Sequence, residues 1–227
     1  MTSIPFTVYD IFAYLSSGSL LLLAIDYAYG SKIVLSEAPP LPLMVAFLFA
    51  SYICGHIVAS LSEPTLEELV TRRWIGIPSE ILMGTEPRPL ACRLFPTYCR
   101  ALPDQTRRRV QAHARSRGFS GSGEPLFLHT FSVVCQSDTE RKRLDEFRNL
   151  YGFSRNVAFS LVFGGLLLAS TIFFSPDPAP PISIIITLAS GLAMFARFLK
   201  FYRQYTYQLF ITYAELPIKE PAKGRRK

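Results

Sequence analysis

The side chains best suited to metal binding or nucleophilic chemistry in this chain are four cysteines and three histidines. Cys92 and Cys99 are seven positions apart, whereas the paired cysteines of zinc sites enclose about two to four residues. Adding His113 and His129 gives a conceivable metal set, but buried or incidental thiols are much commoner than such a site. The spacing therefore predicts no metal site.

No segment matches a motif that carries catalysis. The sequence has no glycine-rich phosphate loop with a lysine, no nucleophile elbow, no His-Glu-x-x-His and no Cys-x-x-Cys. Asp145 and Glu146, with Arg141 and Arg148, are close neighbours in the sequence and fit the solvated face of one helix. We therefore predict no catalytic residue, no cofactor and no enzyme activity.

Hydrophobic residues make up 49% of the 227 residues, and they are concentrated in blocks. Four apolar stretches stand out, at 11–29, 41–61, 157–174 and 182–199. Each is close to the roughly 20 apolar residues that cross about 30 Å of hydrocarbon as a helix. The chain is therefore predicted to be an all-α polytopic membrane protein with four transmembrane helices.

Lys and Arg are distributed unevenly among the connections. Of 24 such residues, fifteen lie in 62–155, eight lie in 197–227, and the remaining one is Lys32. Because positive charge marks the cytosolic side, we expect the cell inner (plasma) membrane, with both termini in the cytosol and a cytosolic helical insert between the second and third spans. This topology also accounts for the net charge of +7, so we expect no nucleic acid as a partner.

These two patterns divide the chain into four parts. Residues 1–61 hold the first two spans, and 62–155 form the basic insert with a stalk helix. Residues 156–199 hold the last two spans, and 200–227 form a cytosolic helix extension and a basic tail. The tail carries five Lys and Arg residues in 219–227, a composition that favours contact with membrane lipids.

The insert is expected to be mostly helical. Pro64, with acidic neighbours, indicates a helix start at 62–68, and residues 74–89, rich in Pro and Gly, are predicted to be irregular. Further helices are expected from 103 to about 117, ended by Gly118, and over 126–134.

Two long helices complete the expected fold. No strong helix breaker occurs from about Asp138 through Phe174, except Gly152, where the helix is expected to bend. The fourth span is predicted to continue to Ala214, because no Pro or Gly occurs before Pro217. The two extensions are expected to pair as an antiparallel stalk.

The second span carries two rows of small residues, each repeating every four positions. The rows are Ala46, Ala50 and Cys54, and Ser51, Gly55 and Ala59. Small residues at this spacing form a flat strip that lets another helix approach closely. We predict that both rows lie at helix–helix contacts.

Hydroxyl side chains form rows on the first and fourth spans. These residues are Ser16, Ser17, Ser19, Ser183, Thr187 and Ser190. They either line a polar path in a channel made of several copies or pack helix on helix. Packing is favoured, because hydroxyls bond readily to their own helix backbone and no charged ring marks a selectivity filter. Asp26 is expected near the outer interface, reaching water rather than acting as a functional acid.

Two segments carry a family resemblance. The string FRNLYGFSRN at 147–156 and the string GHIVASLS at 55–62 resemble a group of uncharacterised bacterial multi-pass inner-membrane proteins with four helices and a cytosolic insert. The resemblance implies this layout for most of the chain, and it implies no known activity.

Both strings are expected where the second and third spans meet the cytosol. Six polar residues there are predicted to form one interfacial polar cluster that fixes the insert onto the spans: His56, Arg148, Asn149, Tyr151, Arg155 and Asn156. The alternative is ordinary interfacial anchoring by Arg, Asn and Tyr side chains.

The function predicted first is that of an interaction or assembly subunit, which acts as a homo-oligomer or with a membrane or cytosolic protein partner, because the sequence has no recognisable sensor or catalytic domain. The second hypothesis is a homo-oligomeric channel or membrane-perturbing effector of a bacterial defence or toxin system. The third is a membrane enzyme that uses Arg, Tyr and Asp.

Overall fold

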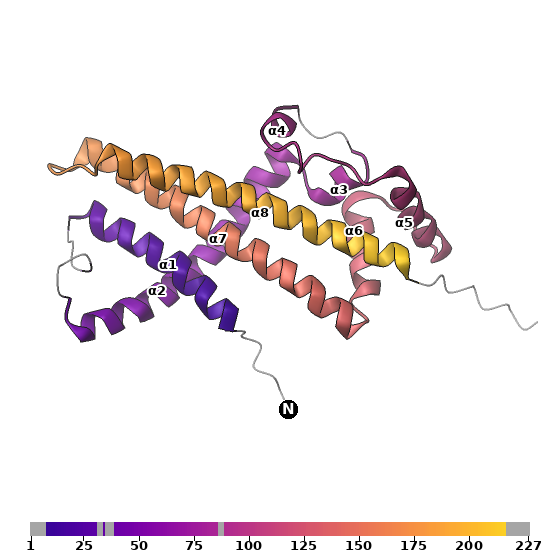
Figure 1. Cartoon of the computed structure of the whole chain (residues 1–227), viewed down its shortest axis with the longest axis horizontal. Coiled ribbons are helices and arrows are strands. Elements are labelled where there is room, and N and C mark those ends of the chain that lie inside the picture. Colours follow the sequence, from indigo (N-terminus) through magenta and orange to yellow (C-terminus); the bar gives the residue numbers. More distant parts are fainter. Residues whose placement is uncertain (1–7, 31–33, 35–38, 86–88, 217–227) are drawn as a thin grey trace, which may run out of the picture. The chain divides into compact units, whose positions relative to one another are not determined.

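The computed structural model describes residues 8–30, 34, 39–85 and 89–216, and within them the chain forms nine helices and no strand. In chain order these are α1 (Val8–Ala28), α2 (Leu41–Ser62), η1 (Glu63–Ile75), α3 (Pro78–Leu82), α4 (Pro89–Leu94), α5 (Asp104–Ser116), α6 (Gly123–Val134), α7 (Asp138–Phe174) and α8 (Pro181–Glu215), shown in Figure 1. The all-helical fold class predicted from the sequence is confirmed.

Four of the helical stretches are long and apolar enough to cross a membrane, and they begin in α1, α2, α7 and α8. The second of them shows how such a helix differs from a soluble one. Leu48, Phe49 and Ile53 of α2 are 52%, 69% and 61% exposed. Such a row of exposed apolar side chains would be unfavourable in water, whereas contact with the hydrocarbon core of a membrane is favourable for it. The prediction of four membrane-length apolar helices is confirmed.

α7 and α8 are longer than a membrane requires. α7 begins at Asp138 and ends at Phe174, as predicted, and it continues through Gly152. Its 37 residues correspond to about 55 Å of helix, nearly twice the hydrocarbon thickness of about 30 Å. α8 ends at Glu215, one residue beyond the predicted end.

The predicted helix start at 62–68 is wrong, because the helix does not stop there. α2 passes directly into η1, a π-helix. Pro64 cannot donate a hydrogen bond and its ring crowds the carbonyl one turn earlier, so the α-helical pattern is interrupted without the chain leaving helix. η1 closes where the Gly76 N–H donates to the Thr71 carbonyl at 2.7 Å, five residues back, and Gly76 has a φ of 106°.

The segment 74–89 is only partly irregular. It contains α3, which starts at Pro78, and α4 starts at Pro89. Proline suits the first turn of a helix, because its fixed φ is helical and its missing N–H would lack a partner there. The two prolines therefore start short helices where composition alone predicted a loop.

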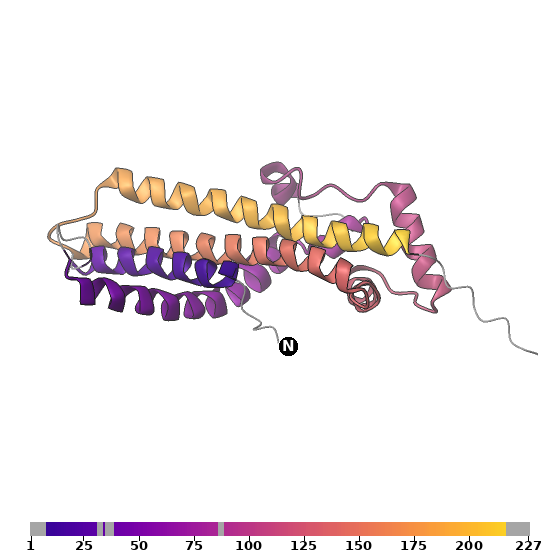
Figure 2. The same ribbon diagram turned by 60° about the horizontal axis from the view of Figure 1, so that its bottom comes forward.

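The chain divides into two compact units. The first contains residues 1–70 and 149–199, and the second contains 71–148 and 200–227. In the first unit α1 and α2 cross closely, and the loop after α7 returns the chain so that α8 runs back beside it, as Figures 1 and 2 show. Ala24, Leu168 and Ile184, from three different helices, form one buried cluster of this unit.

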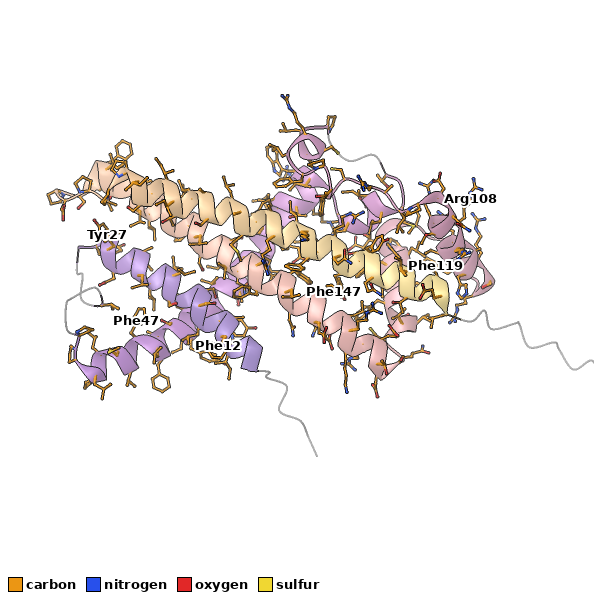
Figure 3. All side chains as sticks on the ribbon, viewed as in Figure 1. Phe12, Tyr27, Phe47, Arg108, Phe119 and Phe147 are labelled. Carbon is orange, nitrogen blue, oxygen red and sulfur yellow. The ribbon has the colours of Figure 1, made fainter. Side chains whose placement is uncertain are left out.

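The second unit is built from the end of η1, α3 to α6, the first part of α7 and the last part of α8. Val110 of α5, Leu126 of α6 and Leu209 of α8 are completely buried. Arg108 lies on the exposed side of α5 (Figure 3). The helix is therefore amphipathic, with an apolar face in the unit and an arginine-rich face in solvent.

Candidate functional site

α1 and α2 meet backbone against backbone. A Cβ atom on Gly18 would lie 1.8 Å from the Ser51 carbonyl oxygen, and one on Gly55 would lie 2.0 Å from the Tyr14 carbonyl oxygen. Real Cβ atoms do not approach other atoms so closely, so only glycine fits at either position. Ser51 and Gly55 of the predicted row therefore face α1 and are buried at the crossing, and Ala59 of the same row is half-buried.

Serine hydroxyls at this crossing are buried inside the first unit. Ser17 and Ser51 are completely buried. The Ser17 hydroxyl bonds to the carbonyl oxygens of Ala13 and Tyr14 on its own helix, at 3.0 and 3.1 Å. The Ser51 hydroxyl has no hydrogen-bond partner among the described residues. The small side chains thus serve close approach of the two helices rather than a chain of hydrogen bonds between them.

The other row of α2 faces outward. Ala46 and Ala50 are exposed, and Cys54 is half-buried. Within this chain the close contact with α1 uses Ser51 and Gly55 instead. The predicted helix contact at Ala46 and Ala50 therefore needs a helix from another molecule, and it stays a prediction.

The predicted interfacial polar cluster is present only in part, around Arg155. Arg155 is 9% exposed, its Nη1 donates to Glu67 Oε2 at 2.7 Å, and Glu63 Oε2 lies 3.9 Å away. Beside it, the Ser62 hydroxyl donates to Asn156 Oδ1 at 2.7 Å. A buried arginine requires such partners, because an unpaired charge in a low dielectric is costly.

The sequence pattern missed Glu63 and Glu67 as members of this cluster. They reach Arg155 because the helix continues through Pro64 as η1, whereas we expected a new helix to start there. The available signal was their spacing of four residues, which places two carboxylates on one helical face.

The other predicted members of the cluster have contacts of their own. His56 stacks on Tyr14 with ring centroids 4.0 Å apart and meets Tyr52 edge-on at 4.8 Å. Tyr151 faces Phe198 at 6.3 Å. Arg148 belongs to the second unit and pairs with Asp145 at 3.2 Å on the exposed surface of α7. Asn149 is half-buried. These contacts do not join the six residues to one another, and the single six-residue cluster stays a prediction.

The hydroxyl rows predicted to line a path or to pack mostly bond to their own helices. Ser16 donates to the Ala13 carbonyl and Ser19 to the Ser16 carbonyl, at 3.1 and 3.0 Å. Ser183 and Thr187 each donate at 2.7 Å to a carbonyl of the preceding turn, and Ser190 is exposed. Hydroxyls satisfied in this way present little polarity to a neighbouring surface.

α7 and α8 also pack through glycines in the first unit. A Cβ on Gly165 would lie 2.6 Å from Leu188 Cδ2, and one on Gly191 would lie 2.8 Å from Val162 Cγ2. Gly191 therefore lies on the face of α8 that packs against α7, whereas the adjacent Ser190 is exposed.

Two histidines and a tyrosine form a cluster in the second unit that the sequence did not predict. His129 Nε2 and the Tyr213 hydroxyl are 3.1 Å apart, and the His113 ring lies edge-on to Tyr213 at 5.4 Å. Phe119, labelled in Figure 3, stacks on His129 at 4.6 Å. The Arg117 guanidinium lies 5.9 Å from the centre of the Tyr213 ring.

Both histidines in this cluster are held neutral. Burial, together with the positive charge of Arg117, lowers the pKa of His113 and of His129 below 6.5. A hydrogen bond with the Leu216 backbone opposes the shift at His113. His113 is 4% exposed and its Nδ1 has no hydrogen-bond partner among the described residues. Protonation of either ring would therefore disturb the packing of α8 against α5 and α6.

The thiols do not assemble a metal site with the histidines. Burial and a hydrogen bond with Cys92 raise the pKa of the Cys99 thiol to about 12, so it stays protonated near neutral pH. Burial also raises the pKa of Cys135. In the described part of the chain, no group of three or more His, Cys, Asp or Glu side chains is placed to hold a metal ion.

Comparison with protein-family models, with curated proteins and with solved structures found no match.

Proposed function

We propose that this chain is an assembly subunit of the bacterial inner membrane that acts through a second copy of itself. The main support for this proposal comes from α2. One of its rows of small residues packs against α1 through Ser51 and Gly55, whereas Ala46 and Ala50 of the second row are exposed. Small side chains let another helix backbone approach closely, and close approach is what drives helix association in lipid. The second copy would contribute the same row.

The charge distribution supports one orientation for this subunit. The insert and the C-terminal segment carry almost all of the Lys and Arg residues, so both face the cytosol in this proposal.

Thiol labelling tests this orientation. The native cysteines are poor labelling sites, because burial raises the pKa of the Cys99 and Cys135 thiols. Ser132→Cys and Phe173→Cys provide exposed reporters in the insert and at the end of α7. A membrane-impermeant maleimide should label Phe173→Cys and spare Ser132→Cys; the reverse result would invert the topology.

Two other functions are less well supported. A channel needs polar groups that face a shared interior, whereas Ser16, Ser183 and Thr187 donate to carbonyl oxygens three or four residues earlier in the chain. A membrane enzyme needs an activated nucleophile or acid–base pair, whereas the buried Arg155 of the first unit is paired with Glu67. Ion flux through vesicles that contain the purified protein separates the channel from the assembly subunit.

Cross-linking in native membranes tests the proposal. In a Cys54→Ser background, Ala50→Cys should form a disulfide-linked dimer under mild oxidation, because the two rows face each other. Ala189→Cys is the matched control, since Ala189 is an exposed alanine on α8, another apolar span. Equal cross-linking at the two positions, or none at Ala50→Cys, would contradict assembly through α2.

A further inference from the structure

Two thiols of the second unit, those of Cys92 and Cys99, are in contact. Cys92 lies on α4 (Figure 1), Cys99 follows it by seven positions, and a hydrogen bond joins the two side chains. On a continuous helix seven positions span about 10 Å, which is too far for two thiols to touch. The chain therefore has to turn back between the two cysteines.

Two consecutive turns bring Cys99 back to α4. The helix ends at Leu94, and the Phe95 N–H donates to the Ala91 carbonyl at 2.7 Å. The Phe95 carbonyl then accepts from the N–H groups of Tyr98 and Cys99, at 3.0 and 3.3 Å. The contact between the thiols therefore agrees with the backbone geometry of the segment that joins them.

The residues on both sides of Cys99 are fixed to other parts of the second unit. The Tyr98 hydroxyl donates to the Gly76 carbonyl at 2.8 Å, just after the end of η1. Arg203 Nη2 of α8 donates to the Arg100 carbonyl, also at 2.8 Å. Because Tyr98 and Arg100 flank Cys99 directly, its backbone is held in place and its thiol stays beside its partner.

The two thiols differ in their readiness to react. Burial, the hydrogen bond with Cys92 and the negative charge of an ionised Cys92 raise the pKa of the Cys99 thiol to about 12. Cys99 therefore keeps its proton near neutral pH, and Cys92 is the thiol of the pair left to act as a thiolate, the nucleophilic form of cysteine. Both side chains are half-buried, so a small oxidant reaches them from solvent. Among the described residues, no third metal-binding side chain joins the pair.

We propose that Cys92 and Cys99 are a modification site, at which a peroxide forms a reversible disulfide. The Cys92 thiolate attacks one oxygen of hydrogen peroxide, the O–O bond breaks, and Cys92 becomes a sulfenic acid while hydroxide leaves and takes up the proton that Cys92 released. The Cys99 sulfur then attacks the Cys92 sulfur, the S–O bond breaks, and the Cys99 proton leaves with the hydroxyl group as water. Two thiols and one peroxide thus give one disulfide and two water molecules. Exchange with two molecules of a small thiol reduces the disulfide again.

A hydrogen peroxide titration of the reduced, detergent-purified chain tests this site. The protein is quenched, unfolded in dodecyl sulfate, alkylated and digested with trypsin, which cleaves after Arg93 and so separates the two cysteines. At limiting peroxide, Cys92 and Cys99 should lose alkylation together, their peptides should be linked within one chain, and dithiothreitol should restore both thiols. Cys135 is the internal control, because it is also half-buried with a pKa raised by burial. Sulfinic acid on Cys92 without a link, a link between chains, or equal loss at Cys135 would overturn the proposal.

A matched variant separates the native contact from mere closeness in the sequence. Thr97→Cys/Cys99→Ser places the second thiol on an exposed residue of the same turn, five positions from Cys92 instead of seven. The two loops differ by only two residues, so the unfolded chains should form their disulfides at similar rates. In the folded protein the variant should form its disulfide at least roughly tenfold more slowly than wild type. Equal folded-state rates would mean that the contact seen for Cys99 does not direct the reaction. Assembly through α2 is measured separately and does not affect these outcomes.

Discussion

The carbonyl oxygen of Ser51 on α2 lies 1.8 Å from the place that a Cβ atom on Gly18 of α1 would occupy. The two backbones are therefore in direct contact, and a side chain of any size at Gly18 must push the helices apart. This contact makes α1 and α2 a hairpin whose geometry depends on glycine.

Gly18→Ala is expected to destabilise the first unit. Overpacking typically costs about 1–3 kcal/mol, and here the obstructing atoms belong to backbone, which cannot rotate away. Thermal unfolding of the detergent-purified protein should show a lower midpoint. Gly152→Ala is the control, because Gly152 lies inside α7 and a Cβ atom there would have nothing within 4 Å; alanine at this position should be neutral or stabilising by up to about 1 kcal/mol. A Gly18→Ala midpoint equal to that of wild type would contradict the close contact.

Two salt bridges of similar length should differ in their effect on stability. Arg155–Glu67 is 2.7 Å long with side chains 11% and 19% exposed, whereas Arg72–Glu124 is 2.6 Å long with side chains 46% and 42% exposed. Glu67→Gln leaves the buried Arg155 with only the more distant Glu63 and should cost roughly 2–4 kcal/mol. Glu124→Gln should cost less than about 1 kcal/mol, because solvent screens the exposed pair. Equal losses in chemical unfolding would mean that Arg155 is solvated.

Acid is expected to loosen the second unit through His113 and His129. Both have a folded-state pKa below 6.5, so the unfolded chain binds more protons than the folded chain as the pH falls through 6.5. The free energy of unfolding is therefore highest above pH 6.5 and decreases below it. Hydrogen exchange of α5 and α6 amides, corrected for the intrinsic effect of pH, should show less protection near pH 5 than near pH 8. The double variant His113→Gln/His129→Gln should lose most of this pH dependence; a wild-type profile in that variant would point to other groups.

The long helices and the four apolar helices of membrane length could be predicted because their signals are local. Asp138 begins α7 and Phe174 ends it where the sequence indicated, since a run without strong helix breakers and an apolar stretch determine those limits. The insert was harder to predict. Pro64 interrupts α-helical hydrogen bonding but leaves a π-helix, and the sequence offers no local sign of which outcome occurs.

The side-chain clusters could not be predicted to the same extent, because they depend on how helices rotate and on residues distant in the chain. Arg155 meets Glu67 across 88 positions, and His129 meets Tyr213 across 84. His56 lies near Arg155 in the expected topology, yet its ring faces Tyr14. One of the two predicted small-residue rows of α2 meets α1 through Ser51 and Gly55, and which row does so depends on the crossing with Gly18.

In the proposed assembly, two copies of the chain meet through Ala46 and Ala50 of α2. The most direct measurement is the protein mass of the detergent-purified chain by light scattering with the detergent contribution subtracted. Wild type should contain at least two chains of 25.5 kDa. Ala50→Phe should reduce the particle to one chain, because a large side chain blocks close approach, while Ala189→Phe should leave the mass unchanged. A wild-type particle of one chain, or an Ala50→Phe particle as large as wild type, would contradict the claim.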